Sequence, residues 1–273
     1  MNPHLEKMKT APRIELETLF RQNAQAVNIG DSHVLCRVLG HYLFVIDAQD
    51  CSVGAHLALN GFWEMWIAIA IARHVKAGMR CIDVGANAGY YTVMMGELVG
   101  PTGFVQSWEP LEPLVGCLRR TVPLNGIFDQ CEIVPCAASD VAGQRLIQIP
   151  QGYWGGASLE PLLRDWTGGT HKSMVETRRL SDTPGRIDFI KVDVEGHEHE
   201  VWRGAKELLD RNPHMTWLVE FNTPKYKDAA GFLDDIQAEG FPLARVDFNG
   251  NIEPITREQI LAAPEFEMLW LTR

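Results

Sequence analysis

No stretch of this sequence is rich in Lys or Arg, and the formal charge of its 273 residues is −10 at pH 7. Nucleic acids and anionic membrane surfaces attract clustered positive charge, so we expect neither of them as a partner. The longest apolar segment, residues 65–72, is too short to span a bilayer. Residues 1–21 carry mixed charges without a hydrophobic centre, so we expect no secretory signal there.

Cysteine is present six times, but no two cysteines form a C-x-x-C pair. Several of them lie in apolar, strand-like segments, which indicates buried thiols in a reducing compartment rather than a disulfide framework or a zinc site. We therefore expect the chain to be cytoplasmic. Its apolar fraction of 46% and charged fraction of 22% are ordinary for a globular protein with a full core.

The segment that organises the rest of the sequence is RCIDVGANAGYYT, residues 80–92. Its apolar start is typical of a strand buried in a parallel sheet, and a helical pattern follows Gly89. A strand, a glycine turn and a helix place backbone N–H groups at the sheet edge where α/β proteins bind ligands. Asp83 interrupts the apolar run, and a buried carboxylate is costly without a partner, so we expect it to face a cationic group.

The spacing of the glycines distinguishes between cofactors. Asp83 to Gly89 reads D-x-G-x-x-x-G and lacks the close glycine pair with which dinucleotide enzymes approach a pyrophosphate. This favours a nucleoside without a pyrophosphate, and S-adenosylmethionine fits, because it carries an adenosine, an ammonium and a carboxylate but no phosphate. Two alternatives stay open at this point: a nicotinamide-dependent oxidoreductase and a non-catalytic cofactor-binding partner protein.

Alternating strand and helix patterns predict an α/β fold with one main domain, residues 61–273, behind a small N-terminal cap, residues 1–60. Residues 141–186 are irregular for this class, and we expect them to form an insertion over the site. The expected helices are 5–24, 61–77, 111–122 and 229–239, the expected hairpin is 33–47, and the expected strands are 81–84, 103–108, 131–137, 187–192, 217–221, 243–248 and 268–271.

Polar residues follow three of the expected strands. Glu109 lies about 20 residues past the glycine turn, where an acid can hold the two hydroxyls of a ribose. Asp193, Glu195 and His197 share one strand-to-helix junction and are more than a helix cap requires. Trp154 stands beside two glycines and is either a stacking surface or a plug under a loop. Glu64 either complements a helix dipole or belongs to the site.

Taken together, these segments resemble the FkbM family of S-adenosylmethionine-dependent methyltransferases. The resemblance rests on IDVGANAGYYT (82–92) and IKVDVEGHEHEVWRGA (190–205) and covers about residues 60–220. Shorter matches are FWE (62–64), WEP (108–110), AASD (137–140) and GGASL (155–159), whereas RLSD (179–182) departs from the usual T-L-D of the family. The resemblance implies a Rossmann-like, seven-stranded class I methyltransferase sheet with helices on both faces. It does not name the acceptor.

On this interpretation, the chain moves the methyl group of S-adenosylmethionine to a hydroxyl or carboxyl oxygen of a small-molecule or sugar acceptor in biosynthetic metabolism. Asp83 would hold the methionine ammonium and Glu109 the ribose. His197 is the preferred base, with Asp193 as the alternative, and Trp154 and Glu195 are expected at the acceptor. The other expected cofactor contacts are Gly85, Ala86, Asn87, Gly89, Thr92, Pro110, Ala138, Ser139 and Asp193.

A divalent metal is a variant of the same mechanism. Asp193, Glu220 and Asn222 are expected at neighbouring strand ends and offer the oxygen ligands that Mg²⁺ prefers. We do not favour this variant, because no spacing within either strand demands a metal. A homo-oligomer is compatible with the sequence but is not indicated by it.

Overall fold

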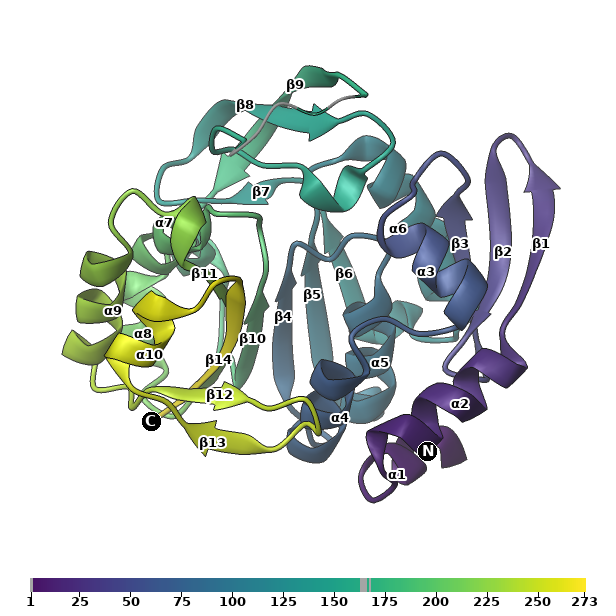
Figure 1. Cartoon of the computed structure of the whole chain (residues 1–273), viewed down its shortest axis with the longest axis horizontal. Coiled ribbons are helices and arrows are strands. Elements are labelled where there is room, and N and C mark those ends of the chain that lie inside the picture. The colour runs from purple at the N-terminus through teal and green to yellow at the C-terminus, as the bar shows by residue number, and fades with distance from the viewer. Residues whose placement is uncertain (1, 163–165, 167) are drawn as a thin grey trace.

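The computed structural model describes residues 2–162, 166 and 168–273. Its central element is an eight-stranded, mostly parallel sheet (Figure 1). The α/β class is confirmed, but the expected seven strands are joined by an eighth, because a short edge strand pairs antiparallel with its neighbour. In sheet order the strands are β13 (Ile252–Pro254), β12 (Ala244–Val246), β14 (Phe266–Thr272), β11 (Thr216–Asn222), β10 (Phe189–Val192), β4 (Arg80–Val84), β5 (Phe104–Trp108) and β6 (Cys131–Val134).

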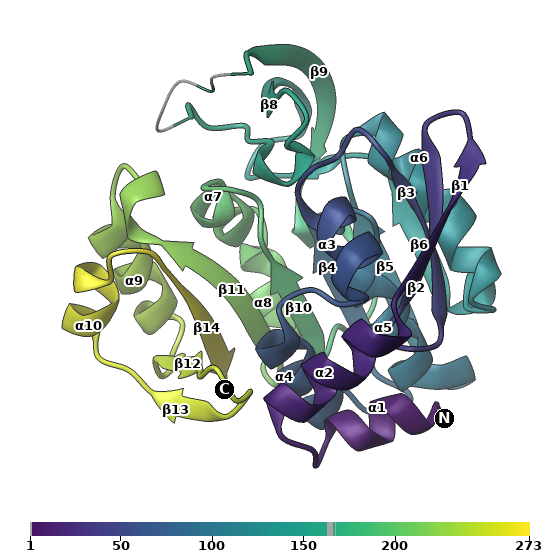
Figure 2. The ribbon, with the colours of Figure 1, turned by 45° about the vertical axis from the view of Figure 1, so that its right-hand side comes forward.

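Helices cover both faces of this sheet (Figures 1 and 2). The reason is visible in β4, where Cys81 belongs to the hydrophobic cluster of one face and Ile82 and Val84 to that of the other. The helices are α1 (Pro3–Met8), α2 (Arg13–Asn23), α3 (Val53–Asn60), α4 (Met65–His74), α5 (Tyr90–Val99), α6 (Glu112–Leu124), α7 (Glu198–Arg203), α8 (Lys206–Arg211), α9 (Ala229–Ala238) and α10 (Arg257–Ala262).

The N-terminal region differs from the expected single helix at 5–24, because the chain forms α1 and α2 instead. Pro12 precedes α2 in an extended conformation, and a proline excludes the residue before it from the helical region. The expected hairpin is confirmed as β2 (His33–Val38) and β3 (Tyr42–Asp47). An unexpected strand, β1 (Gln25–Gly30), pairs with β2 and makes the sheet three-stranded.

The helix expected at 61–77 is found in a shorter form as α4, and an unexpected helix, α3, precedes it with an 85° bend between them. Gly61 ends α3 with a φ of +72°, and a Cβ there would lie 3.0 Å from the carbonyl oxygen of Phe20. Among the described helices, no single one has the length and apolar character needed to cross a membrane. The helices α3 and α4 meet both criteria only when they are counted as one bent pair.

Residues 137–178 build a second small sheet at one end of the large sheet (Figures 1 and 2). It contains β7 (Ala137–Ala138), β9 (Thr170–Arg178) and β8 (Gly143–Pro150), in that order. Because Ala137 joins this sheet, the third strand of the large sheet ends at Val134 rather than at residue 137. Ile147 and Val175 pack against Leu114 of α6, which anchors the insertion.

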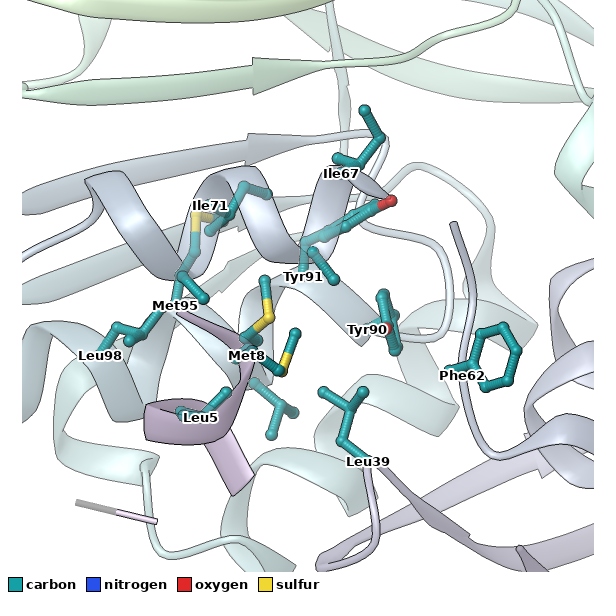
Figure 3. Packing of buried hydrophobic residues seen from close by; sticks show 14 of the residues in the cluster. Leu5, Met8, Leu39, Phe62, Ile67, Ile71, Tyr90, Tyr91, Met95 and Leu98 are labelled. Carbon is teal, nitrogen blue, oxygen red and sulfur yellow. The ribbon is translucent and has the colours of Figure 1, made fainter. Parts of the chain in front are cut away.

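The cap is not packed apart from the rest of the molecule. Leu5 and Met8 of α1 and Phe20 of α2 belong to the same hydrophobic cluster as residues of α4 and α5 (Figure 3). The ring of Tyr91 extends from α5 through this cluster, and its hydroxyl oxygen lies at the end away from α1 (Figure 3). We therefore expect the cap and the main sheet to unfold together.

Replacing Phe20 by Ala tests this coupling. Phe20 is fully buried, so the substitution should lower the free energy of unfolding by about 3–5 kcal/mol. Circular dichroism and tryptophan fluorescence should follow one coincident transition in urea. Ile14→Ala is the matched control on the same helix, because Ile14 is 70% exposed, and it should cost less than about 0.5 kcal/mol. Two separate transitions would show that the cap melts alone.

Candidate functional site

A cavity of about 960 Å³ lies where the ends of β4, β5, β10 and β11 meet the insertion and the junction of α3 and α4. This volume is at the upper end of the range for small-molecule sites, so it can hold a nucleoside together with a second small molecule. Of the sequence-predicted residues, the cavity is lined by Gly85, Ala86, Asn87, Glu109, Pro110, Ala138, Trp154, Asp193, Glu195 and His197.

The glycine turn at the end of β4 is shaped by close packing. Gly85 has a φ of +75°, and a Cβ on it would lie 1.9 Å from the carbonyl oxygen of Asp193. Only glycine fits there, because any side chain would collide with backbone. Asn87 also has a positive φ, +51°, and its N–H group faces Glu109. Gly89 begins α5 behind the turn and does not line the cavity, so its expected cofactor contact is corrected to a packing role against Leu118.

Glu109 is held by two backbone groups. Its carboxylate oxygens accept hydrogen bonds from the N–H groups of Asn87 and Leu111, each at 2.9 Å. Burial raises the pKa of Glu109 to about 7, although these two hydrogen bonds oppose the shift. Because each carboxylate oxygen has a second lone pair, the group can still accept hydrogen bonds from a ligand's hydroxyls.

Asp83 does not reach the cavity, which corrects its expected contact with a cofactor ammonium. Its side chain is completely buried and accepts a hydrogen bond of 2.7 Å from the hydroxyl of Thr92. The cationic group that it faces belongs to the chain itself, namely Lys191, whose Nζ lies 3.7 Å away. Thr92 is equally buried between Asp83 and Ser107, so the structure contradicts its expected cofactor contact as well.

Lys191 is a site residue that the sequence interpretation missed. Its side chain is 2% exposed, and its Nζ donates to the carbonyl oxygen of Gly85 at 3.1 Å and lies 3.4 Å from Asp193. The ammonium also lies 5.3 Å from the ring centre of Tyr91. A lysine inside an apolar strand was the sequence signal that could have identified this residue. The reason for the lysine is visible only in the parallel register, which pairs Lys191 with Asp83.

Three carboxylates gather where β10 and β11 end. Oxygen atoms of Asp193, Glu195 and Glu220 lie within 4.8 Å of one another. Lys225 forms an ion pair with Glu195 and lies 3.5 Å from Glu220. Burial raises the pKa of Glu195 to about 7 and that of Glu220 well above its ordinary value, in spite of this ammonium. The oxygens could hold a divalent cation, and Asn222 also lines this part of the cavity.

The contacts of His197 count against its expected role as the base. The ring is 1% exposed, and its Nδ1 lies 3.0 Å from a carboxylate oxygen of Glu160. Its Nε2 lies 2.9 Å from the hydroxyl of Ser139 and 3.3 Å from the guanidinium of Arg145. Neither nitrogen is free to take a proton from an acceptor. Ser139 is fully buried against this ring and does not line the cavity, so its expected cofactor contact is wrong too.

Hydrogen bonds hold the insertion against one side of the cavity. The N–H group of Trp154 donates to Asp50 at 3.3 Å, and that of Gly155 donates to Ser52 at 2.9 Å, which joins the insertion to the start of α3. The hydroxyl of Ser158 donates to the carbonyl oxygen of Glu195 at 2.7 Å. Trp154 therefore lies at the cavity wall where the cap, the insertion and the large sheet meet.

Glu64 also lines the cavity, and it lies at the break between α3 and α4 rather than within a helix turn. Its carboxylate accepts a hydrogen bond of 2.7 Å from the hydroxyl of Tyr91. Burial and the nearby carboxylate of Asp193 raise the pKa of Glu64 to about 7. The FWE motif indicated a position near the site, and the bend between α3 and α4 places this residue at the cavity.

Loss of the Lys191 ammonium should lower the stability of the folded protein. Lys191→Met leaves the carboxylate of Asp83 buried without its cation, so the free energy of unfolding should fall by about 3–5 kcal/mol. The double variant Asp83→Asn/Lys191→Met removes both charges and should regain part of that loss. Urea denaturation measures all three proteins. A Lys191→Met variant as stable as the wild type would show that the pair is not needed.

The raised pKa values of Glu64, Glu109 and Glu195, each about 7 against an ordinary 4.5, predict a dependence of stability on pH. The folded state binds these protons more tightly than the unfolded state, so their contribution is complete below pH 4.5 and is lost as the pH rises through 7. Glu109→Gln isolates one group: its stability relative to the wild type should increase between pH 5 and pH 8 in thermal melts. A constant difference would contradict the assignment.

The sequence is similar to those of known methyltransferases. Residues 83–247 match the methyltransferase FkbM domain. The methyltransferase sdnD of Sordaria araneosa is 28% identical over 156 residues, 46% of this chain and 60% of that protein. A protein-L-isoaspartate O-methyltransferase of Methanothrix thermoacetophila is 42% identical over 48 residues, 18% of this chain and 23% of that one.

Among solved structures, a SAM-dependent methyltransferase from Aquifex aeolicus has a TM-score of 0.40 and 17% identity, over 73% of this chain and 85% of that chain. The match to each of the two curated relatives covers less than two thirds of that relative's length. The domain match, however, extends over more than half of this chain. The protein therefore belongs to the FkbM family of S-adenosylmethionine-dependent methyltransferases.

Proposed function

We propose that this chain transfers the methyl group of S-adenosylmethionine to an oxygen atom of a small-molecule or sugar acceptor, in biosynthetic metabolism. Family membership supports methyl transfer from this cofactor. The observation that carries the cofactor assignment is Glu109, a cavity carboxylate held by the N–H groups of Asn87 and Leu111. The group is suited to the two hydroxyls of a ribose.

The other residues of the cavity fit the rest of the cofactor. Gly85 has no side chain and Ala86 after it only a methyl group, so this part of the turn leaves room for a ligand, and Ala137 and Ala138 offer a small apolar surface for an adenine. Asp193 replaces Asp83 as the residue proposed to hold the methionine ammonium, because its carboxylate lies in the cavity beside that turn. When bound, the cofactor supplies a methyl group on a positively charged sulfur.

The chain must then align the acceptor with that methyl group and exclude water. Alignment of this kind can supply ~7–11 kcal/mol of the barrier reduction. The contacts of Trp154 with Asp50, and of Ser158 with Glu195, hold the insertion against the cavity and support its proposed role as a cover. We propose Trp154 and Glu195 as acceptor contacts, since both line the cavity.

The charges around the cavity favour a hydroxyl acceptor over a carboxyl acceptor. Glu64, Asp193, Glu195 and Glu220 all line it, and an ionised acceptor carboxylate would add a further negative charge to this acidic cluster, whereas a neutral hydroxyl would not. The proposal does not include a metal ion, because Lys225 already supplies positive charge between Glu195 and Glu220. The same concentration of carboxylates favours an enzyme over a non-catalytic binding protein.

Calorimetry tests the cofactor assignment. S-adenosylmethionine and S-adenosylhomocysteine should bind with micromolar affinity, and Glu109→Ala should weaken binding by ~1.5–3 kcal/mol, the scale of hydrogen bonds to a charged group. Glu112→Ala, which alters an exposed carboxylate at the start of α6, is the matched control and should bind as the wild type does. No heat at millimolar ligand would refute the proposal, and an unchanged affinity of Glu109→Ala would refute the ribose contact.

A further inference from the structure

We propose that Glu64 is the general base that takes the proton of the acceptor's hydroxyl group. This inference rests on the proposed function and goes beyond it, since it assigns the step for which neither nitrogen of His197 is free. It starts from the backbone. Glu64 has a φ of +32° and a ψ of +63°, a left-handed conformation that residues other than glycine rarely adopt. Strain of this kind persists where the surrounding structure imposes it, often at functional sites.

The strained position determines where the carboxylate lies. Glu64 precedes α4 directly, at the 85° bend that follows α3, and the residue lines the cavity. Its Oε2 accepts from the hydroxyl of Tyr91 at 2.7 Å. The ring of Tyr91 in turn holds the ammonium of Lys191, which donates to the carbonyl oxygen of Gly85. A chain of contacts therefore links the Glu64 carboxylate to the glycine turn proposed to bind the cofactor.

The other carboxylates at this end of the cavity are already paired with cations. Asp193 lies 3.4 Å from Lys191, and Lys225 contacts both Glu195 and Glu220. These ammonium groups occupy the carboxylate oxygens that an acceptor's hydroxyl group would otherwise approach. Within the part of the chain that the structure describes, Glu64 has no cation within 4.0 Å and one side-chain hydrogen bond, from Tyr91.

The charged and titratable groups that face Glu64 come from several elements. Asp193 and Glu195, which follow β10, raise its pKa, whereas the Tyr91 hydroxyl and Lys191 lower it. Tyr90 of α5 lies close enough for its own pKa to be raised by Glu64, after burial. Burial is the largest influence on Glu64 and brings its pKa to about 7. A general base works best when its pKa is near the pH of the reaction.

The proposed step balances as follows. The hydroxyl proton passes to a carboxylate oxygen of Glu64, and an electron pair of the hydroxyl oxygen forms the new bond to the methyl carbon. The electron pair of the broken carbon–sulfur bond stays on sulfur. The products are the methyl ether, S-adenosylhomocysteine and protonated Glu64, which returns its proton to solvent.

The first experiment needs no acceptor and measures protons released on binding. At pH 7 Glu64 is only partly ionised in the free protein, and a positively charged sulfur entering the same cavity favours its ionisation. Calorimetry of S-adenosylmethionine binding in buffers of different ionisation enthalpy should therefore reveal proton release by the wild type. Glu64→Gln should release measurably less, and S-adenosylhomocysteine, whose sulfur is neutral, should release less with either protein.

Glu112→Gln, an exposed carboxylate changed in the same way, should behave as the wild type does. If Glu64→Gln binds S-adenosylmethionine and releases as many protons as the wild type, the assignment of Glu64 is overturned. If no variant binds S-adenosylmethionine, the proposed function fails instead, so the two failures can be told apart.

The second experiment uses an acceptor found by incubating labelled cofactor with a panel of hydroxyl compounds. Glu64→Gln should lower the methyl-transfer rate by ~10²–10⁴-fold while cofactor affinity changes little. The wild-type rate should fall as the pH drops below the pKa of Glu64. Tyr91→Phe keeps the ring beneath Lys191 but removes the hydrogen bond to the carboxylate, so the acid limb should move to higher pH.

His197→Gln serves as the comparison, because both nitrogens of that ring have protein partners. It should retain the acid limb of the pH profile at the wild-type position. A Glu64→Gln variant with the wild-type rate, or an acid limb that disappears in His197→Gln instead, would overturn the assignment.

Discussion

The buried carboxylate of Asp83 on β4 faces the buried ammonium of Lys191 on β10, and the geometry of the turn that follows β4 depends on this pair. The parallel register places Lys191 beside Asp83, and the same ammonium reaches the carbonyl oxygen of Gly85 and the carboxylate of Asp193. One cation thus compensates a charge in the sheet interior and fixes the loop that leaves it. Gly85 can approach the backbone of Asp193 so closely only because it has no side chain. The sheet therefore fixes the position of the turn. In α/β proteins, binding residues commonly lie on loops that a rigid sheet positions.

The second constraint is the concentration of acids around one cavity. Burial and mutual repulsion raise the pKa values of Glu64 and Glu195 to about 7, and two ammonium groups offset only part of the negative charge. Such a cavity suits a ligand with a positive centre, as the sulfur of the proposed cofactor would be. His197 contributes differently, because its two nitrogens join Glu160 of the insertion to Ser139 after β7. These contacts connect the insertion to the strand β7.

Local patterns in the sequence were enough to predict seven of the eight strands of the large sheet, the hairpin of β2 and β3, the strand–turn–helix around Gly85, and the family. They failed where one residue outweighs the surrounding periodicity. Pro12 divides the first helix because a proline disfavours the helical conformation of the residue before it, and Gly61 ends α3, a helix that was not expected, before α4 begins. The extra strands β1 and β13 lie at sheet edges: β1 is exposed along its whole length and β13 has only three residues, so neither shows a clear apolar alternation.

The sequence by itself determined the chemistry available to this protein: a glycine turn without a dinucleotide spacing, an acid after the second strand, and carboxylates after the fourth. Tertiary structure decided which of these groups can meet a ligand. Asp83, Thr92 and Ser139 are polar residues beside the site in sequence, yet each is enclosed by partners from other elements. Glu64 reaches the cavity because the chain bends before α4. Exposure and hydrogen-bond partners depend on contacts between distant segments, and such contacts exist only once the strands have taken their register.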